Sequence, residues 1–173
     1  VSYFLHSHHI AKGDKVALLS LNMPQWGVAF FACGVIGAVV VPILPDFHPN
    51  EIKNILHHAD VSVVYVSESL HHKLEHSASL QVITIENFTV ISESEQKPIS
   101  EFDENKFEYP AIEENDLLSI IYTSGTTGKS KGVMLTHKNI VWTAQQSYII
   151  QNILPGDRFL SVLPLSHTYE NTL

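Results

Sequence analysis

The chain has 173 residues, of which 45% are hydrophobic, enough for one domain with a sizeable core or for part of a larger one. The formal net charge is −8, from 10 Lys and Arg against 18 Asp and Glu. This argues against a general nucleic-acid binder, which needs a cationic surface. The single cysteine, Cys33, excludes an intramolecular disulfide framework and is expected to be an inert core residue. The first residues do not resemble a secretory signal, so none is predicted.

Thirty consecutive residues, 16–45, carry no Asp, Glu, Lys or Arg. A transmembrane helix needs about 20 apolar residues in one piece, but Pro24 and Pro42 interrupt this run. We therefore predict a buried strand over residues 15–21, a helix with Pro24 at its first position, and a second strand over residues 38–42.

The same alternation continues along the chain. Spacing and composition predict a helix at 49–59, a strand at 61–66, a short polar helix at 69–76, strands at 80–85, 117–123 and 132–135, a helix from 136 to about 152, and a last strand at 158–162. Strands that alternate with helices indicate right-handed crossovers. The predicted fold class is therefore α/β, with a mostly parallel sheet and flanking helices.

The charge is unevenly distributed. Residues 93–116 hold nine acids against Lys97 and Lys106, which gives −7 of the −8 and predicts a solvated acidic linker. The next forty residues, 117–156, contain no Asp or Glu. A binding site for a polyanion needs such an acid-free zone, although a buried strand followed by an amphipathic helix would also produce one.

The most informative segment runs from Tyr122 to Met134. It follows an apolar strand and contains three glycines, two lysines and five Ser or Thr side chains. Glycines allow successive backbone N–H groups to point into one concavity, the hydroxyls add donors, and Lys131 adds a positive charge. These features predict a phosphate-binding loop at the carboxyl end of a parallel strand.

Other interpretations of this loop are a plain surface loop and the phosphate loop of a kinase or ATPase. The second requires a glycine where Thr123 stands and a helix after the loop, whereas a strand is predicted there. A P-loop kinase or ATPase and a non-catalytic nucleotide-binding module remain the alternatives from other functional classes.

Residues 122–139, YTSGTTGKSKGVMLTHKN, resemble the phosphate-loop signature of the adenylate-forming superfamily, which includes acyl-CoA synthetases, luciferases and the adenylation domains of peptide synthetases. Ser130 departs from the proline that is usual in that family, which should soften the loop without removing a chemical group. Residues 13–18, 22–26 and 37–43 are similar to the family's early segments. Residues 163–170, LPLSHTYE, look most like the long-chain fatty acid–CoA ligases.

The resemblance implies an incomplete part of the N-terminal large domain of such an enzyme. Residues 1–92 would form its first βα segment, 93–116 the acidic linker and 117–173 the phosphate-loop segment with the start of the acyl pocket; the C-terminal domain would be absent. By the same likeness, the ATP phosphates would be held by Thr123, Ser124, Gly125, Thr126, Thr127, Gly128 and Lys131. Lys131 and His167 would be the catalytic residues, and His167 would lie beside the α-phosphate and position the carboxylate. No metal-ligating residue is assigned.

The implied activity is that of an AMP-forming ligase that uses ATP, Mg²⁺ and CoA. A fatty acid, expected to be long-chain, is converted to an acyl-adenylate and then to a thioester; an aryl or short acyl acid is the alternative substrate. The chain alone is expected to be inactive because the family's later motifs have no counterpart in it. The expected partners are small-molecule substrates and not nucleic acid. The expected location is cytoplasmic, with peripheral membrane contact as an option, and the oligomeric state is left open.

Two of the 11 histidines belong to a motif that resembles a zinc site. Residues 72–76 match H-x-x-E-H, but the predicted helix is short and polar and no third ligand is evident. The pairs His8-His9 and His57-His58 place adjacent side chains on different helix faces, which favours a surface position over metal binding.

Overall fold

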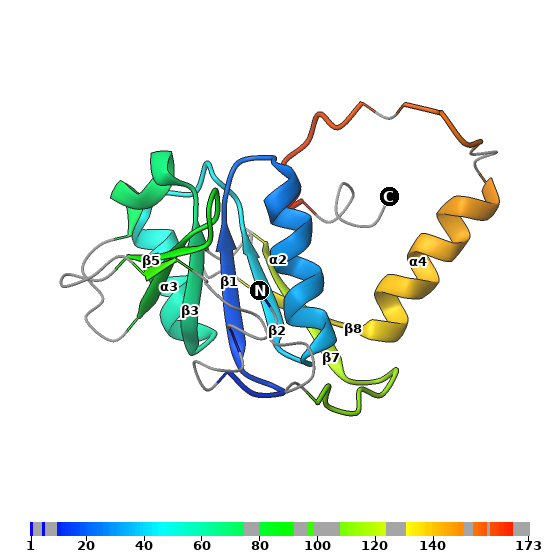
Figure 1. The fold of residues 1–173 in the computed structure, drawn as a ribbon, viewed down its shortest axis with the longest axis horizontal. Coiled ribbons are helices and arrows are strands. Elements are labelled where there is room, and N and C mark those ends of the chain that lie inside the picture. Colours follow the sequence, from blue (N-terminus) through cyan, green and yellow to red (C-terminus); the bar gives the residue numbers. More distant parts are fainter. Residues whose placement is uncertain are drawn as a thin grey trace.

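The computed structural model describes residues 1, 5, 10–74, 80–91, 97–98, 108–123, 131–150, 154–158 and 160–167 (Figure 1). The elements in chain order are β1 (Lys15–Leu19), α2 (Pro24–Val35), β2 (Val39–Ile43), α3 (Pro49–His58), β3 (Val61–Val66), the 3₁₀ helix η1 (Glu68–Lys73), β4 (Gln81–Thr84), β5 (Thr89–Ile91), β6 (Lys97–Pro98), β7 (Leu117–Thr123), β8 (Lys131–Thr136) and α4 (His137–Ile150).

The described strands form one sheet in the order β6-β5-β4-β3-β1-β2-β7-β8. The five inner strands, from β4 to β7 in that order, are parallel to one another. The strands beyond them, β5 and β6 at one end and β8 at the other, pair antiparallel. The predicted α/β fold with a mostly parallel sheet and flanking helices is confirmed.

The helices α2 and α3 cover opposite faces of this sheet. Alternate strand residues fall into two cores, one containing Val16, Leu18 and Val40 with the buried face of α2, the other containing Ala17 and Val41 with the buried face of α3. The reason is topological: the chain moves from β1 to β2 in one direction and then returns past β1 to β3. Right-handed crossovers in opposite directions place their helices on opposite faces.

Local sequence sets where the two helices begin and end. Proline stands in the first turn of both helices, where its missing N–H costs nothing. Helix α3 also has a capping box, in which His48 Nδ1 accepts from the Asn50 N–H and the Glu51 carboxylate accepts from the His48 N–H at 2.9 Å. After α2, Gly37 adopts φ +71°, a conformation that favours glycine.

The uncharged run at 16–45 is β1, α2 and β2, as predicted, and its strands are almost completely buried. Among the described residues, no helix has the length and apolar character required to cross a membrane. Cys33 lies in the core on the α2 side, and burial raises the pKa of its thiol to about 12. A thiol with so high a pKa is inert at neutral pH, as expected from the sequence.

Three local predictions need correction. No strand forms at Arg158 or at residues 160–162, because these residues find no sheet neighbour; Leu160 is 87% exposed. The short polar helix is a 3₁₀ helix that covers Glu68–Lys73. Strands β5 and β6 were not predicted, and β6 lies within residues 93–116, which were expected to form a linker. Strand β5 follows a turn in which Asn87 Oδ1 accepts hydrogen bonds from Thr84 Oγ1 and the Thr89 N–H.

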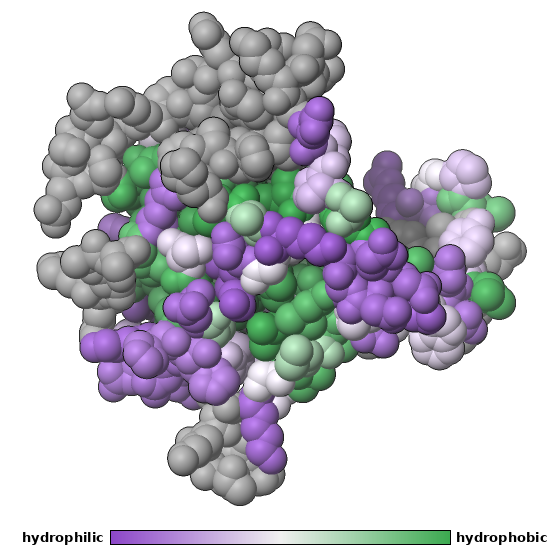
Figure 2. Space-filling model, turned by 90° about the horizontal axis from the view of Figure 1, so that it is seen from below, coloured by the Kyte–Doolittle hydropathy of each residue, from purple (hydrophilic) through white to green (hydrophobic). Residues whose placement is uncertain are grey.

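Helix α4 projects beside the sheet, at the end where β8 is the last strand (Figure 1). Viewed from the amino ends of the parallel strands, it forms a lobe with both polar and apolar surface (Figure 2). Its exposed large apolar side chains are Val141, Trp142, Tyr148 and Ile149. Ile140 instead packs against the core on the α2 side, so the helix contacts the sheet near its first turn.

Candidate functional site

The predicted phosphate loop connects the antiparallel strands β7 and β8. Thr123, the last residue of β7, pairs directly with Lys131, the first residue of β8. Both are exposed, and a cross-strand pair presents its two side chains on the same face of the sheet. The predicted ligands Ser124, Gly125, Thr126, Thr127 and Gly128 lie outside the described residues. The described ends of the loop thus bring together a hydroxyl donor and a lysine ammonium, two groups that suit a phosphate.

The mouth of this hairpin lies at the carboxyl edge of the parallel strands. β7 pairs in parallel with β2, and Ser119 of β7 is aligned with Val40 of β2. The Ser119 hydroxyl donates a 3.0 Å hydrogen bond to the Val40 carbonyl. The carboxyl edge is where open α/β sheets bind their ligands. Tyr122 packs in the core on the α3 side, so the neighbouring Thr123 faces the α2 side, since side chains alternate along a strand.

Tyr122 anchors the start of the loop to helix α3. Its side chain is 5% exposed, and burial raises the pKa of its phenol. The Tyr122 hydroxyl and His58 Nδ1 share a hydrogen bond of 2.7 Å, and the two rings meet edge to face. Sequence reasoning treated His58 only as a surface residue. Its contact with Tyr122 depends on the packing of α3 against β7, for which the sequence gives no local signal.

Gly132, on the other side of the loop, pairs with Tyr122. A Cβ at this position would lie 2.8 Å from Ile120 Cγ2 and 3.4 Å from Tyr122 Cζ. We expect Gly132→Ala to destabilise the fold by about 1–3 kcal/mol, because it overpacks the α3 side of the hairpin. Denaturant unfolding measures this change.

Gly27→Ala is the matched control for that experiment. Gly27 lies inside α2, and a Cβ there would meet nothing within 4 Å. The same chemical change should therefore raise the stability by about 0.5–1 kcal/mol through helix propensity. Equal stabilities of Gly132→Ala and the parent protein would contradict the close packing described for Gly132.

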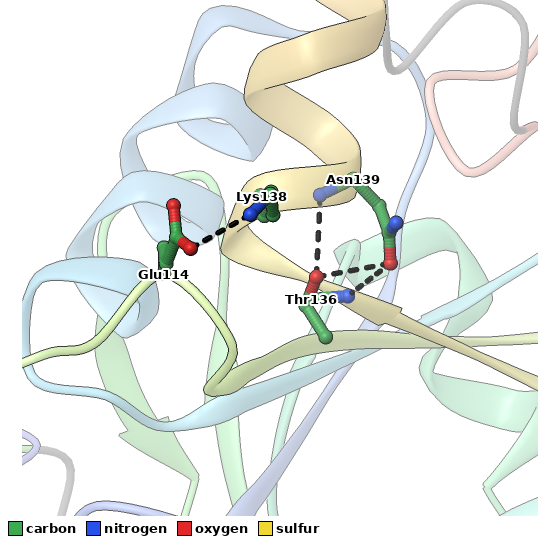
Figure 3. Close-up of polar contacts among 4 residues, drawn as sticks. All are labelled: Glu114, Thr136, Lys138 and Asn139. Atoms are coloured by element: carbon green, nitrogen blue, oxygen red, sulfur yellow. Dashed lines mark hydrogen bonds and ion pairs between the residues drawn. The ribbon is translucent and has the colours of Figure 1, made fainter.

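The other end of the hairpin is fixed at the opposite edge of the sheet. Thr136 Oγ1 accepts from the Asn139 N–H, and Asn139 Oδ1 accepts from the Thr136 N–H, so these residues cap α4 reciprocally (Figure 3). Lys138 forms a 2.7 Å ion pair with Glu114 (Figure 3). Lys12 forms a 2.6 Å ion pair with Asp116, and its hydrogen bond is the main reason why the pKa of Asp116 is lowered.

The acid-free stretch at 117–156 contains Lys129, Lys131 and Lys138, which differ in their surroundings. Lys138 lies past the far end of β8 and is paired with an acid from the predicted linker. Lys131 lies at the carboxyl edge, beside the loop. Lys129 lies outside the described residues. Of the two described lysines, Lys131 is the one that borders the predicted loop.

The segment that carries His167 lies over the turn between β1 and α2, at the same carboxyl edge (Figure 1). Leu165 packs against the core on the α2 side and Ser166 is buried, whereas His167 is exposed. The His167 N–H donates to the Pro164 carbonyl at 2.8 Å, which closes a tight turn. The structure thus brings Thr123, Lys131 and the His167 segment to one edge and one face of the sheet.

Among the described residues, no three His, Cys, Asp or Glu side chains gather as ligands for a metal ion would. Of the H-x-x-E-H motif, His72 belongs to η1 and is exposed. Glu75 and His76 lie outside the described residues.

Comparisons with known proteins identify the family of this chain. The family model described as "AMP-binding enzyme" matches residues 1–173. The chain therefore belongs to the AMP-binding family of adenylate-forming enzymes.

Two curated relatives illustrate the range of that family. The chain is 31% identical to "Long chain acyl-CoA synthetase 7, peroxisomal" from Arabidopsis thaliana, over 94% of this chain and 26% of the relative. It is 30% identical to "Feruloyl-CoA synthase" from an Amycolatopsis species, over 94% of this chain and 31% of the relative. The chain thus spans about a quarter to a third of the length of these relatives.

A solved structure matches the fold over nearly the whole chain. O-succinylbenzoate coenzyme A synthetase from Bacillus subtilis, in complex with ATP and magnesium ion, superposes with a TM-score of 0.77 at 25% identity. The match covers 99% of this chain and 43% of that one. The family and the fold implied by the glycine loop are both confirmed.

Proposed function

We propose that the whole protein activates a long-chain fatty acid with ATP and transfers the acyl group to CoA. The observation that carries this proposal is the β7–β8 hairpin, which presents Thr123 and Lys131 at the carboxyl edge, on either side of the family's glycine loop. The leucine-proline-leucine-serine-histidine segment at 163–167 and the similarity to a long-chain acyl-CoA synthetase support a fatty acid as the substrate.

The reaction proceeds in two steps. A carboxylate oxygen of the acid attacks the α-phosphorus of ATP, and the bond to pyrophosphate breaks, which gives an acyl-adenylate. The sulfur of CoA then attacks the acyl carbon, AMP leaves, and the thiol proton passes to solvent. In the first step two anions must meet, so binding groups of fixed position and opposite charge lower the barrier most.

The residues at the edge suit these requirements. Thr123 and residues 124–128 would donate hydrogen bonds to the phosphates, and the Lys131 ammonium would offset their negative charge. His167 would donate to the reacting oxygens and orient the carboxylate. Mg²⁺ would be bound through the ATP phosphates, as this ion commonly is, and no protein ligand for it is assigned.

Activation of an aromatic acid is the second candidate. The identity to feruloyl-CoA synthase, 30%, is close to the 31% found for the long-chain enzyme. The structural match to the O-succinylbenzoate enzyme points to the same alternative. A cytoplasmic location and a peripheral contact with membranes stay predictions.

The test is the release of pyrophosphate by the whole protein with ATP and Mg²⁺, in the presence of palmitate, a short-chain acid or ferulate. We expect palmitate to give the highest kcat/KM. If ferulate gave the highest kcat/KM, the proposed substrate would be an aryl acid and not a fatty acid. If no acid led to pyrophosphate release, the proposed ligase activity would be refuted. The 173-residue chain alone should release none, because it corresponds to 26% of a long-chain relative.

A further inference from the structure

We propose that Asn22 is a positioning residue that holds the His167 segment at the reaction site. This inference rests on the proposed function. Asn22 is a polar residue within the uncharged run at 16–45 and follows the central strand β1.

The Asn22 side chain binds the segment as a neighbouring strand would. Its Nδ2 group donates to the Leu163 carbonyl at 2.7 Å, and its Oδ1 atom accepts from the Leu165 N–H at 2.8 Å. A longer contact of 3.3 Å joins Nδ2 to Ser161 Oγ. One amide therefore satisfies the carbonyl and the N–H of two alternate residues, which is the pattern that β-ladders use.

The two sides of this contact differ in how well they are fixed. Asn22 follows a strand whose last four residues are buried, and it precedes the first turn of α2. Residues 160–167 of the segment pair with no described strand, and Leu160 and Val162 are 87% and 72% exposed. Among these residues, Leu165 packs against the core on the α2 side and Ser166 is buried. The amide of Asn22 therefore helps to fix the position of His167, which follows Ser166 in the chain.

Asn22→Ala should lower kcat for acyl-adenylate formation by about tenfold and change the KM for ATP little. A displacement of about 1 Å at a reacting group can cost up to about 10²-fold, which makes tenfold a modest expectation. Asn22→Asp keeps the acceptor for the Leu165 N–H but replaces the donor to the Leu163 carbonyl, so it should fall between the parent and Asn22→Ala.

Gln25→Ala is the matched control. Gln25 lies in the first turn of α2, three residues after Asn22, but its amide donates to the Glu86 carbonyl, on the β4–β5 turn, at 3.4 Å. The loss of this amide should leave kcat unchanged. A decrease equal to that of Asn22→Ala would show a general effect on the start of α2 and would overturn the proposal.

A double-mutant cycle with His167→Ala tests whether Asn22 acts through His167. Residues that act as a unit are strongly non-additive, so the double variant should be no slower than His167→Ala alone. If the rate decrease in the double variant equalled the product of the two single decreases, Asn22 would act independently of His167, and the proposal would be wrong.

Amide hydrogen exchange tests the contact between Asn22 and the His167 segment without an activity measurement. In the parent protein the Leu165 amide should be protected, and in Asn22→Ala it should exchange at least tenfold faster, while the amides of β1 stay unchanged. An unprotected Leu165 amide in the parent would refute the contact. If the parent released no pyrophosphate but its Leu165 amide behaved as expected, the proposed function would fail and the anchoring by Asn22 would stand.

Discussion

Lys131→Ala should lower the rate of acid-dependent pyrophosphate release by about 10²-fold in the whole protein. Removal of one fixed donor from a charge-stabilising site typically costs about 10²–10³-fold. Lys131 pairs with Thr123 at the mouth of the glycine loop, and the surrounding forty residues contain no Asp or Glu. The charge that Lys131 would supply to the triphosphate therefore has no acidic competitor from residues 117–156.

The effect should be on catalysis and not on folding. Lys131 is exposed at the start of β8, so its truncation removes little packing, and the denaturant midpoint should stay within experimental error. Lys131→Arg should recover part of the rate, because the charge remains while the geometry of its donors changes.

Lys138→Ala provides the matched control for Lys131→Ala. It removes the same charge from the same acid-free stretch, but Lys138 lies beyond the other end of β8 and pairs with Glu114. We expect an unchanged rate and a stability loss of at most about 1 kcal/mol, since the ion pair is exposed. Equal losses of rate in both variants would mean that net charge matters and that Lys131 has no specific place at the phosphates.

The sequence predicted the parts of this fold that are governed by local chemistry. β-Branched runs became β2 and β3, and Pro24 and Pro49 marked the first turns of the two helices. The apolar strand before the glycine loop became β7. These signals are local because burial on both faces of a parallel strand demands a continuous apolar run.

Features that depend on distant contacts could not be predicted in this way. Nothing near His58 in the sequence indicates that its ring meets Tyr122, 64 residues later. Asn22 and Leu165 are 143 residues apart, and their contact requires the finished turn between β1 and α2. The strand predicted at 158–162 does not form at residues 158 and 160–162 for the same reason: an apolar alternation leads to a strand only where a neighbouring strand is available.

His167→Ala is the second large effect that we expect, a decrease of about 10²-fold in acyl-adenylate formation. The exposed ring follows the buried Ser166 on a segment anchored at the carboxyl edge, on the face where Thr123 and Lys131 lie. A donor at this place would act on the carboxylate as it attacks the α-phosphorus, and its contribution would be larger in the transition state than in the bound substrates.

The kinetic pattern should distinguish His167 from Lys131. Loss of a group that acts in the transition state lowers kcat and kcat/KM together, so His167→Ala should leave the KM for ATP close to that of the parent. Lys131→Ala should raise the KM for ATP as well, because by our proposal Lys131 would also contact the phosphates of bound ATP. Pyrophosphate release measured over a range of ATP concentrations separates the two.

His72→Ala is the control that keeps the chemistry of the substitution constant. His72 is an exposed histidine of η1 and the first residue of the H-x-x-E-H pattern. Its removal should change neither the rate nor its dependence on added Zn²⁺. A large loss in His72→Ala together with an unchanged rate in His167→Ala would move the reaction away from the carboxyl edge and revive the metal interpretation. A large loss in His167→Ala together with an unchanged rate in His72→Ala would require a donor at position 167, on the segment that Asn22 binds.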